Sequence, residues 1–410
     1  MKIHDITLTI IKDSRGQDTL EAEMSRDNNG QIVSVKASVP SGKSTGTHEV
    51  MVAEPTMAVT LLAGIKQEML ERDFADQKQF DDYLLALDGT ENKSKFGGNF
   101  TLALSHAFAR LKANEEGKEL YQYIRDNSEL EIIGDRMVKF AIFNVINGGV
   151  HADNKLDFQE FQIIPTVEDF AEAYRIGKEY YEQLGEAVRQ KFGAEHVTLG
   201  DEAGYSAPFA SNEEALMLMK SVIAAGNYPV RIGIDAAASS YFKDGGYMVE
   251  GKRLSSQEML GMYYDLIFRY NIISFEDPFE EEAFDDFKLL YARLNQGGLD
   301  TRVITDDLTT TNPKRFERAI EEQVSNAILV KPNQIGTLSE TLRVVRMAYS
   351  NNWKVVISHR SGETMDDFIA DLAVGVGAWA LKAGAPGKPE RTAKYDRVVA
   401  IEQKIKAGGM

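Results

Sequence analysis

Apolar and polar residues alternate along the first part of the chain, as expected for strands that bury one face. Residues 19–24 and 32–39 follow this pattern on either side of Asp27-Asn28-Asn29-Gly30, which is a strong hairpin signal. Residues 3–11 provide a third candidate strand. The pattern therefore predicts a three-stranded antiparallel meander at the start of the chain.

Helical spacing of apolar positions replaces this alternation over residues 56–125, most clearly over 57–70 and 99–111. The pattern is interrupted at Asp126-Asn127-Ser128 and at Gly134-Asp135. We therefore predict an N-terminal α+β domain over residues 1–130, made of the meander plus helices.

Beyond residue 138 the chain is organised as short apolar strands, each of which runs into polar or glycine-rich residues and then into a helix. Several of these helices begin with a capping box, at Ser211, Ser255 and Thr337. The candidate strands are residues 138–146, 161–164, 197–199, 231–234, 272–275, 302–304, 327–330, 354–357 and 379–381. Alternating strands and helices predict an α/β domain with a mostly parallel sheet.

The length of residues 131–410 is typical of a (β/α) barrel. An open doubly wound sheet is the alternative fold, but no G-x-G-x-x-G follows a first strand. We therefore predict a catalytic barrel over residues 131–410.

Consecutive predicted strands end in chemically active side chains. In chain order these are Asp235, Glu276, Asp306, Lys331, His359 and Lys382. On a closed barrel such strand ends meet at one mouth. Three carboxylates there would repel one another unless a cation lay between them, and a hard divalent ion such as Mg²⁺ prefers oxygen ligands. A single strand-end acid is as often a helix cap, but that alternative does not explain the lysine and histidine that continue the series.

Two further acids belong to this group. Glu202 lies in the turn formed by residues 200–204, and Glu160 follows Gln159 just before a predicted strand. An acid beside other acids has a raised pKa, which suits proton donation to a leaving group. With Lys331 as a base at a strand end, the set suits removal of a proton α to a carboxylate and loss of a β-hydroxyl.

Composition narrows the possible functions. The chain has 410 residues, a hydrophobic content of 43%, a formal net charge of -17 and no cysteine. The negative charge argues against nucleic acid or an anionic membrane as a partner, and the lack of cysteine excludes disulfides and thiolate sites. We find neither a signal peptide nor a membrane-spanning apolar run, so we predict a cytoplasmic location.

Nine ordered motifs, spread over nearly the whole chain, resemble those of the enolase family. They are residues 41–46, 88–94, 147–152, 158–161, 200–202, 276–278, 306–308, 333–337 and 358–364. The resemblance implies an N-terminal capping domain before an enolase-type (β/α)8 barrel. It also implies reversible dehydration of 2-phosphoglycerate, a small phosphorylated acid, to phosphoenolpyruvate in glycolysis and gluconeogenesis, and a homo-oligomer, either a dimer or an octamer.

The same resemblance assigns roles to individual residues. It makes Lys331 the base that takes the C2 proton and Glu202 the acid that assists loss of the C3 hydroxyl, with Glu160 in support. Two Mg²⁺ ions per active site are implied, the first held by Asp235, Glu276 and Asp306 and the second completed by Ser44. The implied substrate contacts are His151, Gln159, Glu160, Ser358, His359, Arg360, Ser361 and Lys382, of which His359 and Lys382 also assist catalysis.

The chain departs from the family pattern around the predicted pocket. Lys43 and Ala203 replace a usual alanine and a usual glycine, and the loop over residues 50–57 lacks an expected arginine. These differences suggest one alternative, a paralogue that dehydrates a related phosphonate or phosphate acid. A non-catalytic scaffold that kept the fold is a further alternative, of a different class. Gly42-Lys43-Ser44 is not a P-loop, because Ala37 stands where that motif needs glycine.

Overall fold

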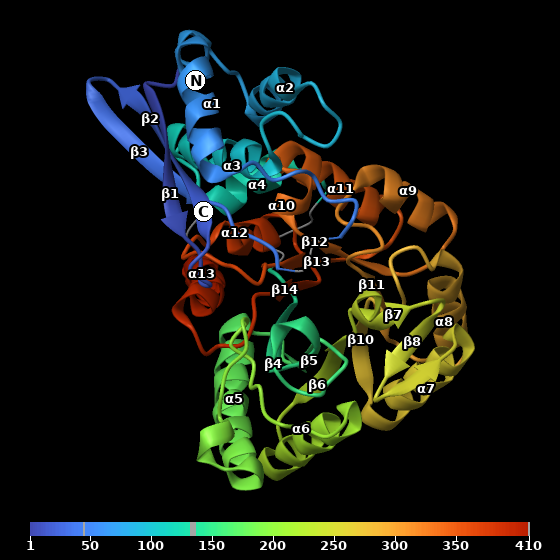
Figure 1. The fold of residues 1–410 in the computed structure, drawn as a ribbon. Helices are drawn as coiled ribbons and strands as arrows, with labels where there is room; N and C mark the ends of the chain where they lie inside the picture. Colours follow the sequence, from blue (N-terminus) through green and yellow to red (C-terminus); the bar gives the residue numbers. More distant parts are fainter. Residues whose placement is uncertain (44–45, 132–136, 409–410) are drawn as a thin grey trace.

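The computed structural model describes residues 1–43, 46–131 and 137–408. Its N-terminal part contains the predicted meander, with β1 (Asp5–Lys12), β2 (Asp18–Asn28) and β3 (Gln31–Ser38) paired antiparallel in that order (Figure 1). The β2–β3 turn is the predicted one, because Asn29 and Gly30 both have positive φ, as a two-residue hairpin requires. Four helices complete this part: α1 (Pro55–Glu71), α2 (Gln77–Asp88), α3 (Gly98–Glu115) and α4 (Leu120–Asn127).

The second part is a closed barrel, as predicted. Its strands are β4 (Phe140–Asn147), β5 (Glu160–Pro165), β6 (Val230–Asp235), β10 (Ile272–Glu276), β11 (Arg302–Thr305), β12 (Ala327–Val330), β13 (Lys354–Ser358) and β14 (Ala380–Lys382). Apolar side chains from these strands, including Ile142, Ile304 and Leu329, fill the interior. The barrel is therefore a packed core that can support a site at one end.

Helices surround the barrel (Figure 1). They are α5 (Phe170–Phe192), α6 (Asn212–Gly226), α7 (Ser256–Tyr270), α8 (Phe284–Gln296), α9 (Pro313–Glu321), α10 (Pro332–Ile335), α11 (Leu338–Ser350), α12 (Phe368–Gly375) and α13 (Pro389–Lys406). Ser211, Ser255 and Thr337 cap α6, α7 and α11 as predicted, each accepting a backbone N–H with its side chain. A small sheet of β7 (Phe242–Lys243), β8 (Gly246–Val249) and β9 (Lys252–Leu254) lies between β6 and α7.

Two predictions about the strands are wrong. Residues 197–199 form no strand: they follow a 3₁₀ turn, Ala194–His196, and Leu199 makes only an isolated bridge to Tyr205. Leu199 is also exposed, so this short apolar run does not mark a buried element. In addition, no α-helix separates β4 from β5, and β5 pairs antiparallel with both of its neighbours.

The reversed direction of β5 matters for the site. Because β5 runs against its neighbours, its first residue lies at the barrel end where the other strands finish. Glu160 accordingly pairs in register with Asn147, the last residue of β4, and with Asp235, the last residue of β6. A side chain from a strand start thus joins side chains from strand ends.

The N-terminal part contacts the barrel through polar and aromatic groups. Arg110 of α3 forms ion pairs with Asp366 and Asp367, just before α12, and the ring of His106 stacks on Phe368 at 3.5 Å. Asp81 of α2 accepts the N–H of Ser339 and so caps α11. Most of the N-terminal part has its own hydrophobic core, but the buried residues of α4, such as Leu120 and Ile124, belong to the core of the barrel. We still propose the division near residue 130; Gly134 and Asp135 lie outside the described residues.

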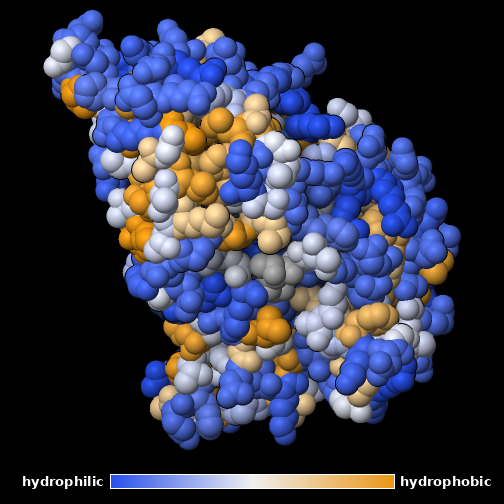
Figure 2. Space-filling model, turned by 45° about the horizontal axis from the view of Figure 1, so that its top comes forward, coloured by the Kyte–Doolittle hydropathy of each residue, from blue (hydrophilic) through white to orange (hydrophobic). Residues whose placement is uncertain are grey.

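Hydrophilic side chains cover much of the face in Figure 2, and apolar ones gather mainly on its left half. None of the described helices is long and apolar enough to cross a membrane.

Candidate active site

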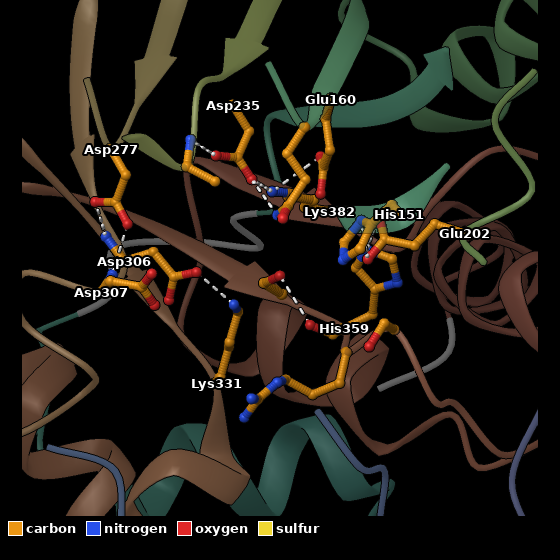
Figure 3. Close-up of a pocket in the computed structure, with 15 residues that line it drawn as sticks. His151, Glu160, Glu202, Asp235, Asp277, Asp306, Asp307, Lys331, His359 and Lys382 are labelled. Atoms are coloured by element: carbon orange, nitrogen blue, oxygen red, sulfur yellow. Dashed lines mark hydrogen bonds and ion pairs between the residues drawn. The ribbon is translucent and has the colours of Figure 1, made fainter. Parts of the chain in front are cut away.

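The predicted site residues meet in one pocket at the barrel mouth (Figure 3). The pocket is lined by His151, Gln159, Glu160, Glu202, Asp235, Ala237, Asp277, Asp306, Asp307, Lys331, Ser358, His359, Arg360, Ser361 and Lys382. Glu276 lies beside this lining, in contact with Lys382. Ser44, the predicted ligand of a second metal ion, lies outside the described residues.

Lys382 is the centre of a buried carboxylate cluster. Its ammonium nitrogen lies 2.8 Å from Glu276, 3.0 Å from Glu160 and 3.3 Å from Asp235, and its side chain is 3% exposed. Burial lowers the pKa of Lys382, but these carboxylates outweigh burial and raise it well above the usual range. Burial and Asp235 likewise raise the pKa of Glu276. The cluster therefore requires a cation, and Lys382 supplies one.

Lys331 forms a second buried pair. It directly follows β12, and its ammonium nitrogen lies 2.5 Å from Asp306. Burial lowers the pKa of Lys331, but Asp306 more than compensates, so the net direction is upward. Desolvation alone would favour the neutral amine, but in this arrangement the Asp306 carboxylate favours the protonated amine.

Glu160 and Glu202 lie close together, on the side of the pocket opposite Lys331. Burial and the Glu202 carboxylate raise the pKa of Glu160 well above its ordinary value. Burial also raises the pKa of Glu202, but the imidazoles of His359 and His151 outweigh burial and hold it low. Asn144 additionally donates a hydrogen bond to Glu202 at 2.8 Å. These opposite shifts favour the proton of the pair on Glu160 rather than on Glu202, the predicted acid.

The two halves of the expected proton chemistry lie on opposite sides of the pocket. Figure 3 shows Lys331 beside Asp306 on one side, and Glu202 with His151 and His359 on the other. A molecule bound between them could lose a proton to one side and receive one from the other.

The guanidinium of Arg360 forms an ion pair with the carboxylate of Glu49. Its two terminal nitrogens lie 2.9 and 3.0 Å from the oxygens of Glu49, and one of them also donates to Asn333 at 3.0 Å. This bidentate geometry is the one that arginine uses for phosphate. Sequence reasoning could not find Glu49 as a partner, because 311 positions separate the two residues.

Two of the three departures from the family pattern, Lys43 and Ala203, have defined local surroundings at the turn that carries Glu202. The ammonium of Lys43 lies 2.8 Å from Asp201, so its charge is paired at the pocket rim. Ala203 adopts a left-handed backbone with φ of 68°, which is the conformation that favours glycine at this turn.

The donor set suits a hard divalent cation. Asp235 and Glu276 are neighbours in register and are buried, and all their donor atoms are oxygens. Among the described residues, two groups of three bring potential ligand atoms within 4.8 Å of one another, and neither is the predicted trio of Asp235, Glu276 and Asp306. They are His151 with Glu160 and Glu202, and Asp277 with Asp306 and Asp307.

Asp277 and Asp307 line the pocket but are not among the predicted site residues, although each directly follows a predicted ligand. Asp277 accepts the backbone N–H groups of Asp306 and Asp307 at 2.9 and 2.7 Å, so it orders the turn that carries Asp306. The doubled acids at residues 276–277 and 306–307 were the available signal.

Comparisons with known proteins agree with this geometry. A family model described as "Enolase, N-terminal domain" matches residues 3–124, and one described as "Enolase, C-terminal TIM barrel domain" matches residues 136–410. The chain belongs to the enolase family. A curated relative named Enolase, from Methanocaldococcus jannaschii, is 40% identical over 418 aligned residues, which cover 98% of this chain and 96% of the relative. Enolase-family membership thus extends over both parts of the chain.

Proposed function

We propose that this enolase-family chain catalyses the magnesium-dependent, reversible dehydration of 2-phosphoglycerate to phosphoenolpyruvate. The observation that supports this most strongly is the placement of Lys331 opposite the Glu160–Glu202 pair in one buried pocket. Because a base and an acid act on opposite sides, the proton and the hydroxyl can leave from opposite faces of the substrate.

The substrate would lie with its phosphate toward Arg360 and Ser361 and its carboxylate toward Lys382. Lys331 takes the proton from C2, and the electron pair moves into the carboxylate. The C3–O bond then breaks as the C2=C3 double bond forms, and the hydroxyl leaves as water with the proton that Glu202 shares with Glu160. His151, Gln159, Ser358 and His359 complete the proposed substrate contacts.

Asp235, Glu276 and Asp306 are the residues that we propose hold magnesium. Bound magnesium would stabilise the negative charge that develops on the substrate carboxylate. Since Asp306 now raises the pKa of Lys331, any other cation that engages Asp306 would favour the neutral, basic amine. We also still predict a second magnesium ion, whose site Ser44 would complete, as well as a homo-oligomeric state and a cytoplasmic location.

Purified protein should convert 2-phosphoglycerate to phosphoenolpyruvate, followed as a rise in ultraviolet absorbance, with magnesium and not with excess chelator. Lys331→Ala should lower kcat by about 10²- to 10⁴-fold, the usual range for loss of a general base. Lys314→Ala is the matched control, because Lys314 is an exposed lysine on α9. Activity that survives both chelation and Lys331→Ala would contradict the proposal.

The two alternatives are not favoured. The paired charge of Lys43 adds no free cation at the pocket rim for a different acid. A scaffold needs neither Lys331 nor the buried Glu160–Glu202 pair.

A further inference from the structure

Arg391 is a buried cation in contact with the pocket, and the mechanism above does not use it. It lies in the first turn of α13 and is fully buried. Its guanidinium donates to the carbonyl oxygens of Arg360 at 2.7 Å, Ser361 at 2.6 Å and Asp201 at 3.2 Å. One side chain thereby connects the loop after β13 with the turn that carries Glu202.

The same guanidinium contacts the ring of His359. One terminal nitrogen of Arg391 lies 2.5 Å from Nδ1 of His359. A guanidinium has five N–H donors and no acceptor, so Nδ1 must present its lone pair. Burial lowers the pKa of His359 to about 4, so the ring is neutral at pH 7 and carries its single proton on the other nitrogen.

The surroundings of the other ring nitrogen, Nε2, favour the same tautomer. Nε2 of His359 is buried and lies 3.5 Å from an oxygen of Glu202, which is longer than the usual limit of about 3.2 Å, so the ring nitrogen faces the carboxylate without a formed hydrogen bond. A carboxylate accepts and does not donate, so a protonated Nε2 matches it. The other tautomer would place an N–H against the guanidinium and a lone pair against the carboxylate.

The packing leaves this arrangement little freedom. Gly384 has a φ of +87°, and a Cβ there would lie 2.9 Å from the Arg391 side chain, 2.9 Å from the Glu202 carbonyl oxygen and 3.2 Å from the His359 ring. Glycine is therefore required where the three residues converge.

We propose that Arg391 is a positioning residue that holds His359 with its proton on Nε2, so that the imidazole faces Glu202 as a hydrogen-bond donor. The ring orients the Glu202 carboxylate toward the pocket, and Arg391 acts on the reaction only through the ring. The tautomer is independent of the reaction, whereas the kinetic consequence rests on the proposed function.

The direct test is the tautomer itself. Protein labelled with ¹⁵N-histidine is examined by two-bond ¹⁵N–¹H correlation at pH 7, and the His359 signals are identified by their loss in His359→Gln. We expect wild-type His359 to show a protonated Nε2 and an unprotonated Nδ1. A proton on Nδ1 in the wild-type protein overturns the inference without any Arg391 variant.

Two variants of Arg391 then distinguish control of the His359 tautomer from simple structural support of the loops. Arg391→Lys can only donate and should keep the tautomer, whereas Arg391→Gln can present an acceptor oxygen and should move the proton toward Nδ1. Lys394→Met is the control, because Lys394 is buried on the same helix, one turn further on, and binds Thr364, Glu390 and Glu363 instead of His359.

The kinetic consequence is a lower kcat with little change in KM. Arg391→Gln should lower kcat by about 10- to 100-fold, as is typical when an outer partner of a functional histidine is lost, and Arg391→Lys should restore most of it. Equal losses in both variants with an unchanged tautomer would overturn the inference. If the wild-type protein has the stated tautomer but does not dehydrate 2-phosphoglycerate, the proposed function fails and the assignment of the tautomer stands.

Discussion

Replacing Lys382 with methionine tests the buried charge cluster. The substitution keeps the length and apolar stem of the side chain but removes the cation between Glu160, Glu276 and Asp235, each within 3.3 Å of the ammonium. All four side chains are buried, so solvent cannot replace the lost charge. We expect a large loss of stability in metal-free solution.

The size of the stability loss in Lys382→Met follows from the least costly response of the variant, which is to protonate one carboxylate of the cluster. At pH 7 this costs about 3.7 kcal/mol, because each pH unit above the unfolded glutamate pKa of about 4.3 costs about 1.4 kcal/mol. Loss of one partner from a buried ion pair typically costs about 3–5 kcal/mol, which agrees. The pKa of Glu276 is already raised, and the substitution raises it further. The deficit should therefore shrink by about 1.4 kcal/mol per pH unit as the pH falls from 7 toward about 5.

Urea unfolding in the presence of chelator measures this deficit. Trp353 and Trp379 are the only tryptophans in the chain, and both are buried in the barrel, so their fluorescence reports on this part. Lys191→Met is the control, because Lys191 is an exposed lysine on the barrel helix α5 that forms an ion pair with Glu214; we expect little loss there. A deficit for Lys382→Met below about 1 kcal/mol, or one that does not change with pH, would refute the reasoning.

Three further predictions follow from single contacts. Glu49→Gln should weaken the competition between residue 49 and phosphate for the Arg360 guanidinium. Binding of inorganic phosphate, measured by calorimetric titration, should therefore tighten by about fivefold, equivalent to about 1 kcal/mol. Weaker binding would mean that Glu49 positions the arginine instead. Burial lowers the pKa of His106 to about 3, so its neutral ring contributes stability above about pH 6.5 that is lost as the pH falls toward 3. As the pH falls over that window, the free energy of unfolding of His106→Phe, measured in urea, should rise relative to that of the parent by up to about 1.4 kcal/mol per pH unit. A difference between the two proteins that does not change with pH would contradict the assignment. Gly384→Ala should cost about 1–3 kcal/mol more than Gly117→Ala, which has a positive φ but no neighbour within 4 Å; equal thermal unfolding of the two would show that the close packing is not needed.

Local patterns predicted much of the fold and many of the residues at the barrel mouth. The hairpin turn at Asn29 and Gly30 and the capping residues of three barrel helices depend only on neighbouring residues, so the sequence was sufficient there. Asp235 and Glu276 end neighbouring parallel strands, so counting strand ends also predicted that they meet.

Features that depend on tertiary structure could not be predicted in this way. The antiparallel direction of β5, which places Glu160 in the pocket, has no local signature. The contacts of Glu49 with Arg360 and of Arg391 with His359 join segments that meet only after folding. The downward shift in the pKa of Glu202 depends on two imidazoles from other loops.

Deuterium exchange at C2 of 2-phosphoglycerate in D₂O, with magnesium present, is the measurement that addresses the central claim most directly. If Lys331 removes the proton and the Glu160–Glu202 pair serves the leaving hydroxyl, Glu202→Gln should still exchange the C2 hydrogen while forming little phosphoenolpyruvate. Lys331→Ala should do neither. Exchange that persists in Lys331→Ala, or that disappears in Glu202→Gln while Lys331→Ala retains it, would contradict the assignment of base and acid to the two sides of the pocket.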